Sequence, residues 1–290
     1  MAKRRRIVRS VRRAARPEEV RYHLLRPHQI VARRTACPVA YIPVGTLEWH
    51  GVHNPVGTDT LQAEEFAVRC AEKGGGLAFP PLYYGESRSE ALMEANAADR
   101  ARIADKMGLP VTNFEGVHQY FPPNQQTENY HRLLLHILTE VETLGFKVGV
   151  LVAGHYPLID HCRSAVPAFA KRTLDPPASG RMLAWAFVDY LLVNDRFDCA
   201  GDHAGGWETS HMPAIRPESV DLALLPPRGE ALIGAGGRMD PRDANAAFGR
   251  KTIEAAVDAA VREARHRLEH PQRYRGHGTC LLENFWKDKT

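Results

Sequence analysis

The sequence predicts an α/β fold in which a mostly parallel β-sheet lies between layers of helices. Short, nearly continuous apolar runs alternate along the chain with longer segments whose apolar residues recur at helical spacing. Strands that are apolar at every position are typical of parallel sheets, because helices cover both faces of such sheets. The chain has 290 residues, 44% hydrophobic and 25% charged, which fits one large globular domain and excludes disorder as its main state.

The clearest part of this pattern is a helix followed directly by a strand. In residues 128–144, leucine and valine recur every three or four positions, and Gly145 follows where such a helix would end. Residues 147–153 are an apolar run that predicts a buried strand. A helix leading straight into a buried strand favours an α/β fold.

The other elements follow the same rules. Further strands are expected at residues 38–45, 77–84 and 182–188. The second of these contains Pro80 and Pro81, so it should end early or lie at an edge. Further helices are expected at residues 91–107, 158–170 and 243–268, and at 60–71 with Asp59 as N-cap. No repeat or linker divides the chain, so residues 20–290 are predicted to form a single domain.

Charge is distributed unevenly along the chain. The net charge of +4 includes eight lysines and arginines in residues 1–16, where no acidic residue occurs, so the rest of the chain carries about −4. Residues 1–19 are therefore predicted to be a solvated basic N-terminal arm, and nucleic-acid binding is not expected. No run approaches the roughly 18 apolar residues of a membrane helix, and no apolar export segment follows the arginines, so we expect a cytoplasmic protein.

Ionisable side chains gather directly after three of the predicted strands. They are Glu48, His50 and Asp59 after the first, His155 after the strand at 147–153, and His203 and Glu208 after the last. The carboxyl ends of parallel strands meet at one edge of a sheet, where ligands bind in such folds. Imidazole and carboxylate groups at this density are a ligand set for Zn, Mn or Fe rather than for Mg or Ca.

The sequence therefore predicts one or two divalent ions held by Glu48, His50, Asp59, His155 and Glu208. Such an ion lowers the pKa of bound water from about 15.7 toward about 7 and polarises a carbonyl, which favours hydrolysis of a small amide. An amine leaves more easily when it is protonated, and His203 is suited to deliver that proton because the usual histidine pKa is about 6.5. Alternatively, His203 orients Glu208, the second candidate catalytic group.

Two of these segments resemble one known family. Residues 48–59, E-W-H-G-V-H-N-P-V-G-T-D, resemble the E-x-H-G-x-H-x-P-x-x-T-D signature of the creatininase (creatinine amidohydrolase) family, and residues 203–210, H-A-G-G-W-E-T-S, resemble its H-A-G-x-x-E-T-S segment. The resemblance implies a three-layer α/β/α sandwich, metal-dependent cleavage of a cyclic amide or related C–N bond, and a homo-oligomer, often a hexamer. By position, it places Glu48, His50, Asp59 and His155 on metal ligands, with Asp59 bridging two ions, and His203 on a catalytic acid or base.

The chain departs from the family pattern at two places. Creatininases carry a glutamate two residues after the histidine that matches His155, and this chain has Pro157 there. Glu208 is expected to supply the missing carboxylate, because its segment should open on the same edge. Residues 194–201 contain Phe197 but lack the tryptophan of the loop that closes over creatinine, so creatinine itself is not the expected substrate.

Other functions fit the same residues. Within the family, a deformylase of formamides and a peptidase that trims a small precursor are alternatives to cleavage of a cyclic amide. A different class is a non-catalytic nucleic-acid-binding or scaffold protein, in which the basic arm acts and the site has decayed. Finally, two histidines and a carboxylate can hold a single iron for redox chemistry.

Overall fold

A four-stranded parallel sheet forms the centre of the molecule. The computed structural model describes residues 18–85, 98–114, 120–171 and 181–274, so most of the expected basic arm lies outside the described residues. The strands are β1 (Val39–Val44), β2 (Leu77–Ala78), β3 (Val148–Ala153) and β4 (Leu183–Val188), in the order β2-β1-β3-β4. All neighbouring pairs are parallel, as predicted from the apolar runs.

The register aligns the ends of the three long strands. Val44 of β1 pairs with Ala153 of β3, and Ala153 pairs with Val188 of β4. Because the strands run in the same direction, the segments that follow these three residues all leave the sheet at one edge. This alignment brings the candidate ligands, far apart in sequence, to a common place.

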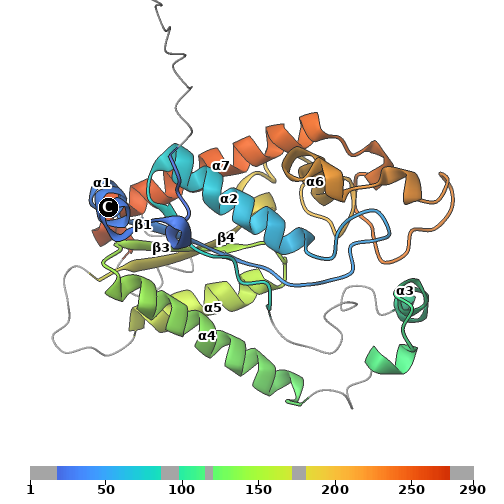
Figure 1. Cartoon of the computed structure of the whole chain (residues 1–290), viewed down its shortest axis with the longest axis horizontal. Helices are drawn as coiled ribbons and strands as arrows, with labels where there is room; N and C mark the ends of the chain where they lie inside the picture. The colour runs from blue at the N-terminus through green and yellow to red at the C-terminus, as the bar shows by residue number, and fades with distance from the viewer. Residues whose placement is uncertain (1–17, 86–97, 115–119, 172–180, 275–290) are drawn as a thin grey trace, which may run out of the picture.

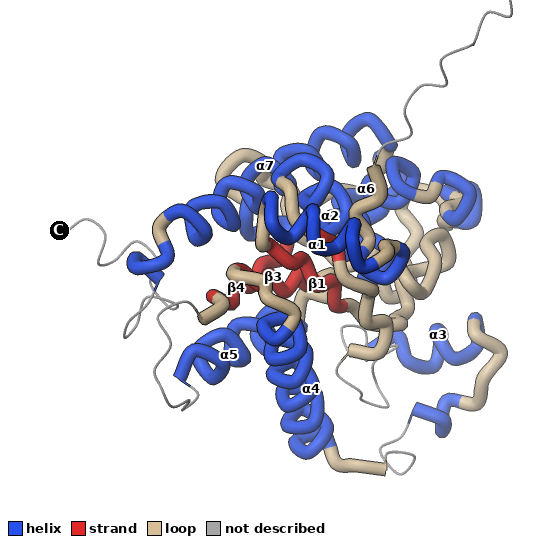
Figure 2. The backbone as a smooth tube through the Cα atoms, turned by 60° about the vertical axis from the view of Figure 1, so that its left-hand side comes forward, coloured by secondary structure: helices blue, strands red, loops and turns tan. Residues whose placement is uncertain are grey.

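Helices cover both faces of the sheet, which gives three layers (Figures 1 and 2). One face carries α2 (Thr58–Gly74), α6 (Gly206–Ile215) and α7 (Ala246–Glu269), and the opposite face carries α4 (Pro123–Thr143) and α5 (Leu158–Lys171). A further helix, α1 (Pro27–Ala36), precedes β1. The α/β/α sandwich implied by the sequence is therefore confirmed.

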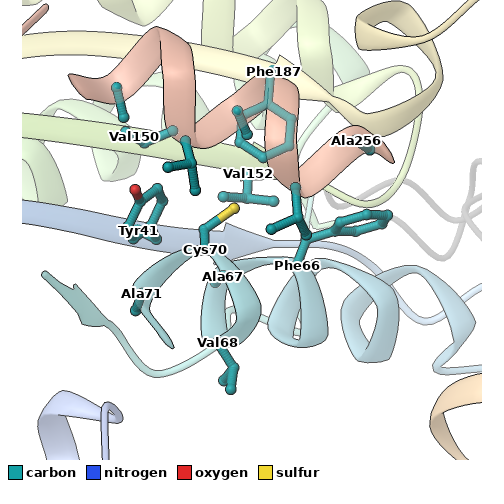
Figure 3. Packing of buried hydrophobic residues seen from close by; sticks show 14 of the residues in the cluster. Tyr41, Phe66, Ala67, Val68, Cys70, Ala71, Val150, Val152, Phe187 and Ala256 are labelled. Atoms are coloured by element: carbon teal, nitrogen blue, oxygen red, sulfur yellow. The ribbon is translucent and has the colours of Figure 1, made fainter. Parts of the chain in front are cut away.

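Apolar side chains from the helices and the sheet interlock in the core. Phe66 and Cys70 of α2 point toward the strands, where they meet Tyr41 of β1 and Val150 and Val152 of β3 (Figure 3). A second buried cluster lies between the other face of the sheet and the helices α4 and α5. Burial on both faces explains why the strands are apolar at nearly every position.

A third, smaller cluster lies at the side of the molecule where α3 (Arg100–Lys106) stands apart from the sandwich (Figure 1). It contains Trp49, Ile103, Ala104 and Phe114. The indole N–H of Trp49 donates to the Ile233 carbonyl at 2.9 Å. This cluster ties α3 and the loop around residue 233 to the segment that follows β1.

Several predicted boundaries were wrong, and each has a physical reason. Helix α2 begins at Thr58 with Gly57 as its N-cap, so Asp59 lies inside the first turn and is not the cap. Asn245, rather than a residue near 243, caps α7 by accepting a hydrogen bond from the Phe248 N–H at 2.9 Å. Strand β2 ends at Ala78 and lies at the edge of the sheet, as Pro80 and Pro81 predict.

Two helices were missed and two others differ from their predicted ranges. Neither α1 nor α6 is among the helices that the sequence predicts. Helix α4 begins at Pro123 rather than near 128, and only part of the helix expected at 91–107 falls within the described residues, where α3 starts at Arg100.

Within the described chain, no helix has both the length and the apolar character needed to cross a bilayer.

Candidate metal site

The candidate ligands come from the three segments that follow β1, β3 and β4. Glu48 and His50 lie in the loop after β1, and Asp59 lies in the first turn of α2. His155 follows β3 directly, while Glu208 lies in the first turn of α6, after β4. All five side chains are at least 90% buried. The structure therefore brings together every residue that the sequence singled out as a ligand.

One group of ligands forms around His155. Its Nδ1 lies 2.9 Å from Oε2 of Glu48 and 3.2 Å from Oδ2 of Asp59. One nitrogen and two carboxylate oxygens thus point to a common centre, within 4.8 Å of one another. This is a set of three ligands of the kind that zinc and manganese accept.

A second group forms around His50. Its Nδ1 donates to the carbonyl oxygen of Glu48 at 3.0 Å, which directs Nε2 toward the carboxylates. Nε2 lies 2.9 Å from Oδ1 of Asp59 and 3.6 Å from Oε2 of Glu208. Since the two oxygens of Asp59 face different histidines, the two groups share this one carboxylate.

A third combination, of Glu48, His50 and His203, also satisfies the distances for a metal ion. It overlaps the other two, because Glu48 belongs to the first group and His50 to the second. The sharing means that the three combinations cannot all be filled independently. Only the first two groups use different oxygens of the same carboxylate, that of Asp59.

Unpaired polar atoms show that this site fits metal ions. Both carboxylate oxygens of Glu48, Nε2 of His50 and Oδ2 of Asp59 are buried and have no hydrogen-bond partner among the described residues. Leaving such atoms without a partner is costly, since burial removes their contacts with water. A divalent ion in each group would give a partner to one oxygen of Glu48, to Nε2 of His50 and to an oxygen of Asp59.

The pKa values of the candidate ligands also indicate that the site fits metal ions. Burial alone would lower the pKa of His50, but the neighbouring carboxylates, with Asp59 contributing most, raise it to about 10. The pKa of His155 is likewise raised to about 10, because the neighbouring carboxylates of Asp59 and Glu48 outweigh the effect of burial. Burial would raise the pKa of Asp59, but both histidines hold it well below its usual value. The carboxylates therefore favour a positive charge at both histidines, which a divalent ion could supply in place of the bound protons.

His203 lies beside this pair of groups with one ring nitrogen free to act. Its Nε2 donates to the Trp49 carbonyl at 2.8 Å, which leaves Nδ1 facing the site, 3.9 Å from Oε2 of Glu48. The side chain is 21% exposed, more than any of the five ligands. Burial lowers the pKa of His203, so the ring is neutral at neutral pH. Among the described residues, no hydrogen bond or ion pair joins His203 to Glu208.

The loop that carries His203 has a strained backbone. Ala204 has a φ of 51°, in the left-handed region that residues with a Cβ rarely adopt. In this conformation its N–H donates to Oε2 of Glu208 at 2.8 Å, and its carbonyl accepts from Nε2 of His53 at 3.2 Å. His53 therefore supports the loop and belongs to none of the three groups.

A family model described as creatininase (creatinine amidohydrolase) matches residues 23–264. The chain belongs to the creatininase family. The matched range includes every strand of the sheet and all the candidate ligands.

Two curated proteins are similar in sequence to this chain. A 3-dehydro-scyllo-inosose hydrolase of Thermotoga maritima is 36% identical over 217 residues, and a creatinine amidohydrolase of Pseudomonas putida is 25% identical over 194 residues. These alignments cover 73% and 63% of this chain. They span 58% and 66% of the relatives' own lengths, less than two thirds of either.

Solved creatininase structures share the fold. A variant creatininase described as the Zn-Zn type has a TM-score of 0.63 at 20% identity, covering 88% of this chain and 99% of that chain. A structure described as creatininase with Mn has a TM-score of 0.61 at 21% identity, covering 88% of this chain and 100% of that chain. The three-layer architecture is thus the creatininase architecture.

The two departures from the creatininase pattern can now be placed. Pro157 lies on the exposed surface, whereas Glu208 occupies the second group with His50 and Asp59. Phe197 packs against Trp207 and Phe248 in the core, with ring centroids 5.8 and 6.1 Å away, and so does not replace the tryptophan of a closing loop.

Proposed function

We propose that this protein is a metal-dependent hydrolase that opens a C–N bond of a small, carbonyl-bearing substrate such as a cyclic amide or a formamide. The observation that carries the proposal is the sharing of Asp59 between two buried groups of ligands. Glu48, Asp59 and His155 would hold one ion, and His50, Asp59 and Glu208 the other. When bound, Zn or Mn ions polarise a carbonyl and make water a nucleophile at neutral pH.

The count of buried charges supports two ions rather than one. Glu48, Asp59 and Glu208 supply three carboxylates in a site that water hardly reaches. One divalent ion would leave a net negative charge, while two ions would leave one positive charge that a single bound anion would cancel. A buried site that is neutral overall is far less costly than a charged one.

His203 would handle the proton that the leaving amine needs. Its Nε2–H is held by the Trp49 carbonyl, so the proton is accepted and delivered at Nδ1, the atom that faces the site. As the most exposed of the site side chains, His203 stands where a substrate enters. The remaining residues hold the ions and exclude water.

A second candidate substrate class is favoured by one comparison. The relative with 36% identity is named as a hydrolase of 3-dehydro-scyllo-inosose, which is a polyhydroxylated ring ketone. The shared chemistry would be attack of water on a ring carbonyl. A screen of lactams, formamides and inososes distinguishes the classes, because amine release reports cleavage of a C–N bond and the inosose yields none.

We also infer that the chain forms a homo-oligomer. Large apolar side chains remain exposed on the described surface, among them Tyr84 at 77%, Tyr120 at 91% and Leu224 at 58%. An interface between copies of the chain would remove such apolar side chains from water. Light scattering in solution tests this, and a monomer at all concentrations would contradict it.

The test of the metal-dependent activity uses two ligand variants. In Glu48→Gln and Glu208→Gln, we expect about one ion fewer per chain and loss of hydrolysis by about a hundredfold or more. Glu218→Gln is the matched control, because Glu218 is exposed and lies outside the site. Elemental analysis and the substrate screen are the measurements. Full activity after complete chelation of Zn, Mn and Fe would refute the proposal.

A further inference from the structure

Asp202 is a buried carboxylate that has no place in either group of ligands. It lies 9% exposed, one residue before His203 and just ahead of α6. One oxygen, Oδ2, accepts a hydrogen bond from the backbone N–H of Trp207 at 2.7 Å. The other, Oδ1, accepts from the backbone N–H of Glu208 at 3.1 Å. Asp202 therefore holds the first turn of the helix that carries a candidate ligand.

Two glycines pack closely against Asp202. A Cβ added at Gly205 would lie 2.4 Å from Oδ2 of Asp202, and one added at Gly237 would lie 2.3 Å from its Cβ. His203 and Gly236 exchange backbone hydrogen bonds of 3.1 and 2.8 Å, which fix the next residue of the loop. Both glycines let the backbone approach the carboxylate closely.

Glu208 is thereby held at both ends. Asp202 fixes its backbone, and the N–H of Ala204 fixes Oε2 of its side chain at 2.8 Å. The same oxygen lies 3.6 Å from Nε2 of His50. By contrast, Glu48, Asp59 and His155 lie outside α6 and have no described contact with Asp202.

A contribution to folding stability does not explain why residue 202 is an aspartate. Among the described residues, no lysine, arginine or histidine forms an ion pair with Asp202. Burying a carboxylate without a counter-charge is costly, and an uncharged Asn or Ser could cap the same turn. The two carboxylate oxygens of Asp202, however, accept from two successive backbone N–H groups, and so fix the first turn of α6 more strictly than the single acceptor of Asn or Ser.

We propose that Asp202 is a positioning residue that places Glu208 for the ion shared with His50 and Asp59. The inference rests on the proposed function, because it requires that Glu208 bind an ion. Its consequence is selective: loss of Asp202 weakens the ion of the second group and leaves the ion held by Glu48, Asp59 and His155 unchanged. Groups bonded to metal ligands commonly change affinity by about 10- to 100-fold when removed.

The experiment measures zinc binding by the full chain, using competition with a chromophoric chelator. We expect wild type to bind two ions tightly, and Asp202→Asn to bind one as tightly and the other about tenfold or more weakly. Asp189→Asn is the matched control. Asp189 is equally buried and contacts the same helix, but through the indole N–H of Trp207 at 2.8 Å, so its loss should lower stability without separating the two affinities.

Each outcome has one meaning. If Asp202→Asn binds both ions like wild type while Glu208→Gln loses one, the positioning role is wrong and the proposed function stands. If Glu208→Gln also binds both ions normally, Glu208 is no ligand and both proposals fail. Circular dichroism shows whether Asp202→Asn folds. If it does not, Asp202→Ser, which keeps one acceptor oxygen, takes its place and is expected to weaken binding of the second ion only. Equal weakening of both ions overturns the inference.

Discussion

The buried ring of His211 makes the stability of this protein sensitive to acid. His211 lies in α6 with no exposed surface, between Oε1 of Gln62 at 2.8 Å and Oγ1 of Thr252 at 2.9 Å. Burial lowers its pKa to about 3, and Asp189, the nearest carboxylate at 4.0 Å, does not offset this. In the unfolded chain the same ring has a pKa of about 6.5.

The sign and size of the effect follow from this difference. Between the two pKa values the unfolded chain binds a proton that the folded chain does not, so the free energy of unfolding falls as the pH falls below about 6.5. The slope is about 1.4 kcal/mol per pH unit, which amounts to about 2 kcal/mol between about pH 7.5 and about pH 5. The full contribution of His211 is present above its unfolded pKa.

The assay compares wild type with His211→Gln, a side chain that can donate to Gln62 and accept from Thr252 but cannot be protonated. Urea unfolding of metal-free protein at both pH values gives the free energies of unfolding. The variant should lose about 2 kcal/mol less than wild type over this interval. Parallel pH dependence in the two proteins would refute the reasoning, because it would mean that His211 takes up no additional proton on unfolding.

Two further predictions concern the N-cap of α7 and the contact of α7 with α6. Asn245→Ala should lower the free energy of unfolding by about 1 kcal/mol, because it removes the acceptor for the Phe248 N–H, while Asn245→Asp should leave it nearly unchanged; urea unfolding of both variants is the check. Gly249→Ala should destabilise by about 3 kcal/mol or more, since a Cβ there would lie 1.9 Å from the Ser210 carbonyl oxygen. Gly236→Ala is the control, because a Cβ there meets nothing within 4 Å, and it should change the free energy of unfolding by less than about 1 kcal/mol in the same urea experiments. Similar losses in the two glycine variants would contradict this argument.

The sheet could be predicted from sequence because the burial of each strand is visible in that strand's own residues. A strand buried on both faces must be apolar throughout, and the runs ending at Val44, Ala153 and Val188 satisfy that requirement. Parallel strands then bring their ends to one edge whatever the loops between them do. For this reason the meeting of Glu48 with His155 could be expected before any coordinates were known.

Helix α6 could not be predicted in this way. Nearly all of its residues are buried, so it has no polar face and no helical period to detect, and Pro213 lies within it. The structural role of Asp202 was missed for the same reason, since a capping carboxylate is only visible once the helix it caps is known. For Asp59 the sequence predicts a cap that the structure does not show. Its place before the helix suited an N-cap, but Gly57 is the N-cap of α2 and the carboxylate of Asp59 faces His50 instead.

The small cluster around Trp49 gives the molecule a unit that can open by itself. Helix α3 packs through Ile103 and Ala104 against this indole, and the carboxylate of Asp99 accepts from the Gly234 N–H at 3.0 Å. Few buried groups resist detachment of α3, so hydrogen exchange there should be faster than in the sheet. Because the carbonyl of Trp49 also anchors His203, a transient opening of this flank would loosen the proton-transferring ring while the sandwich stays folded.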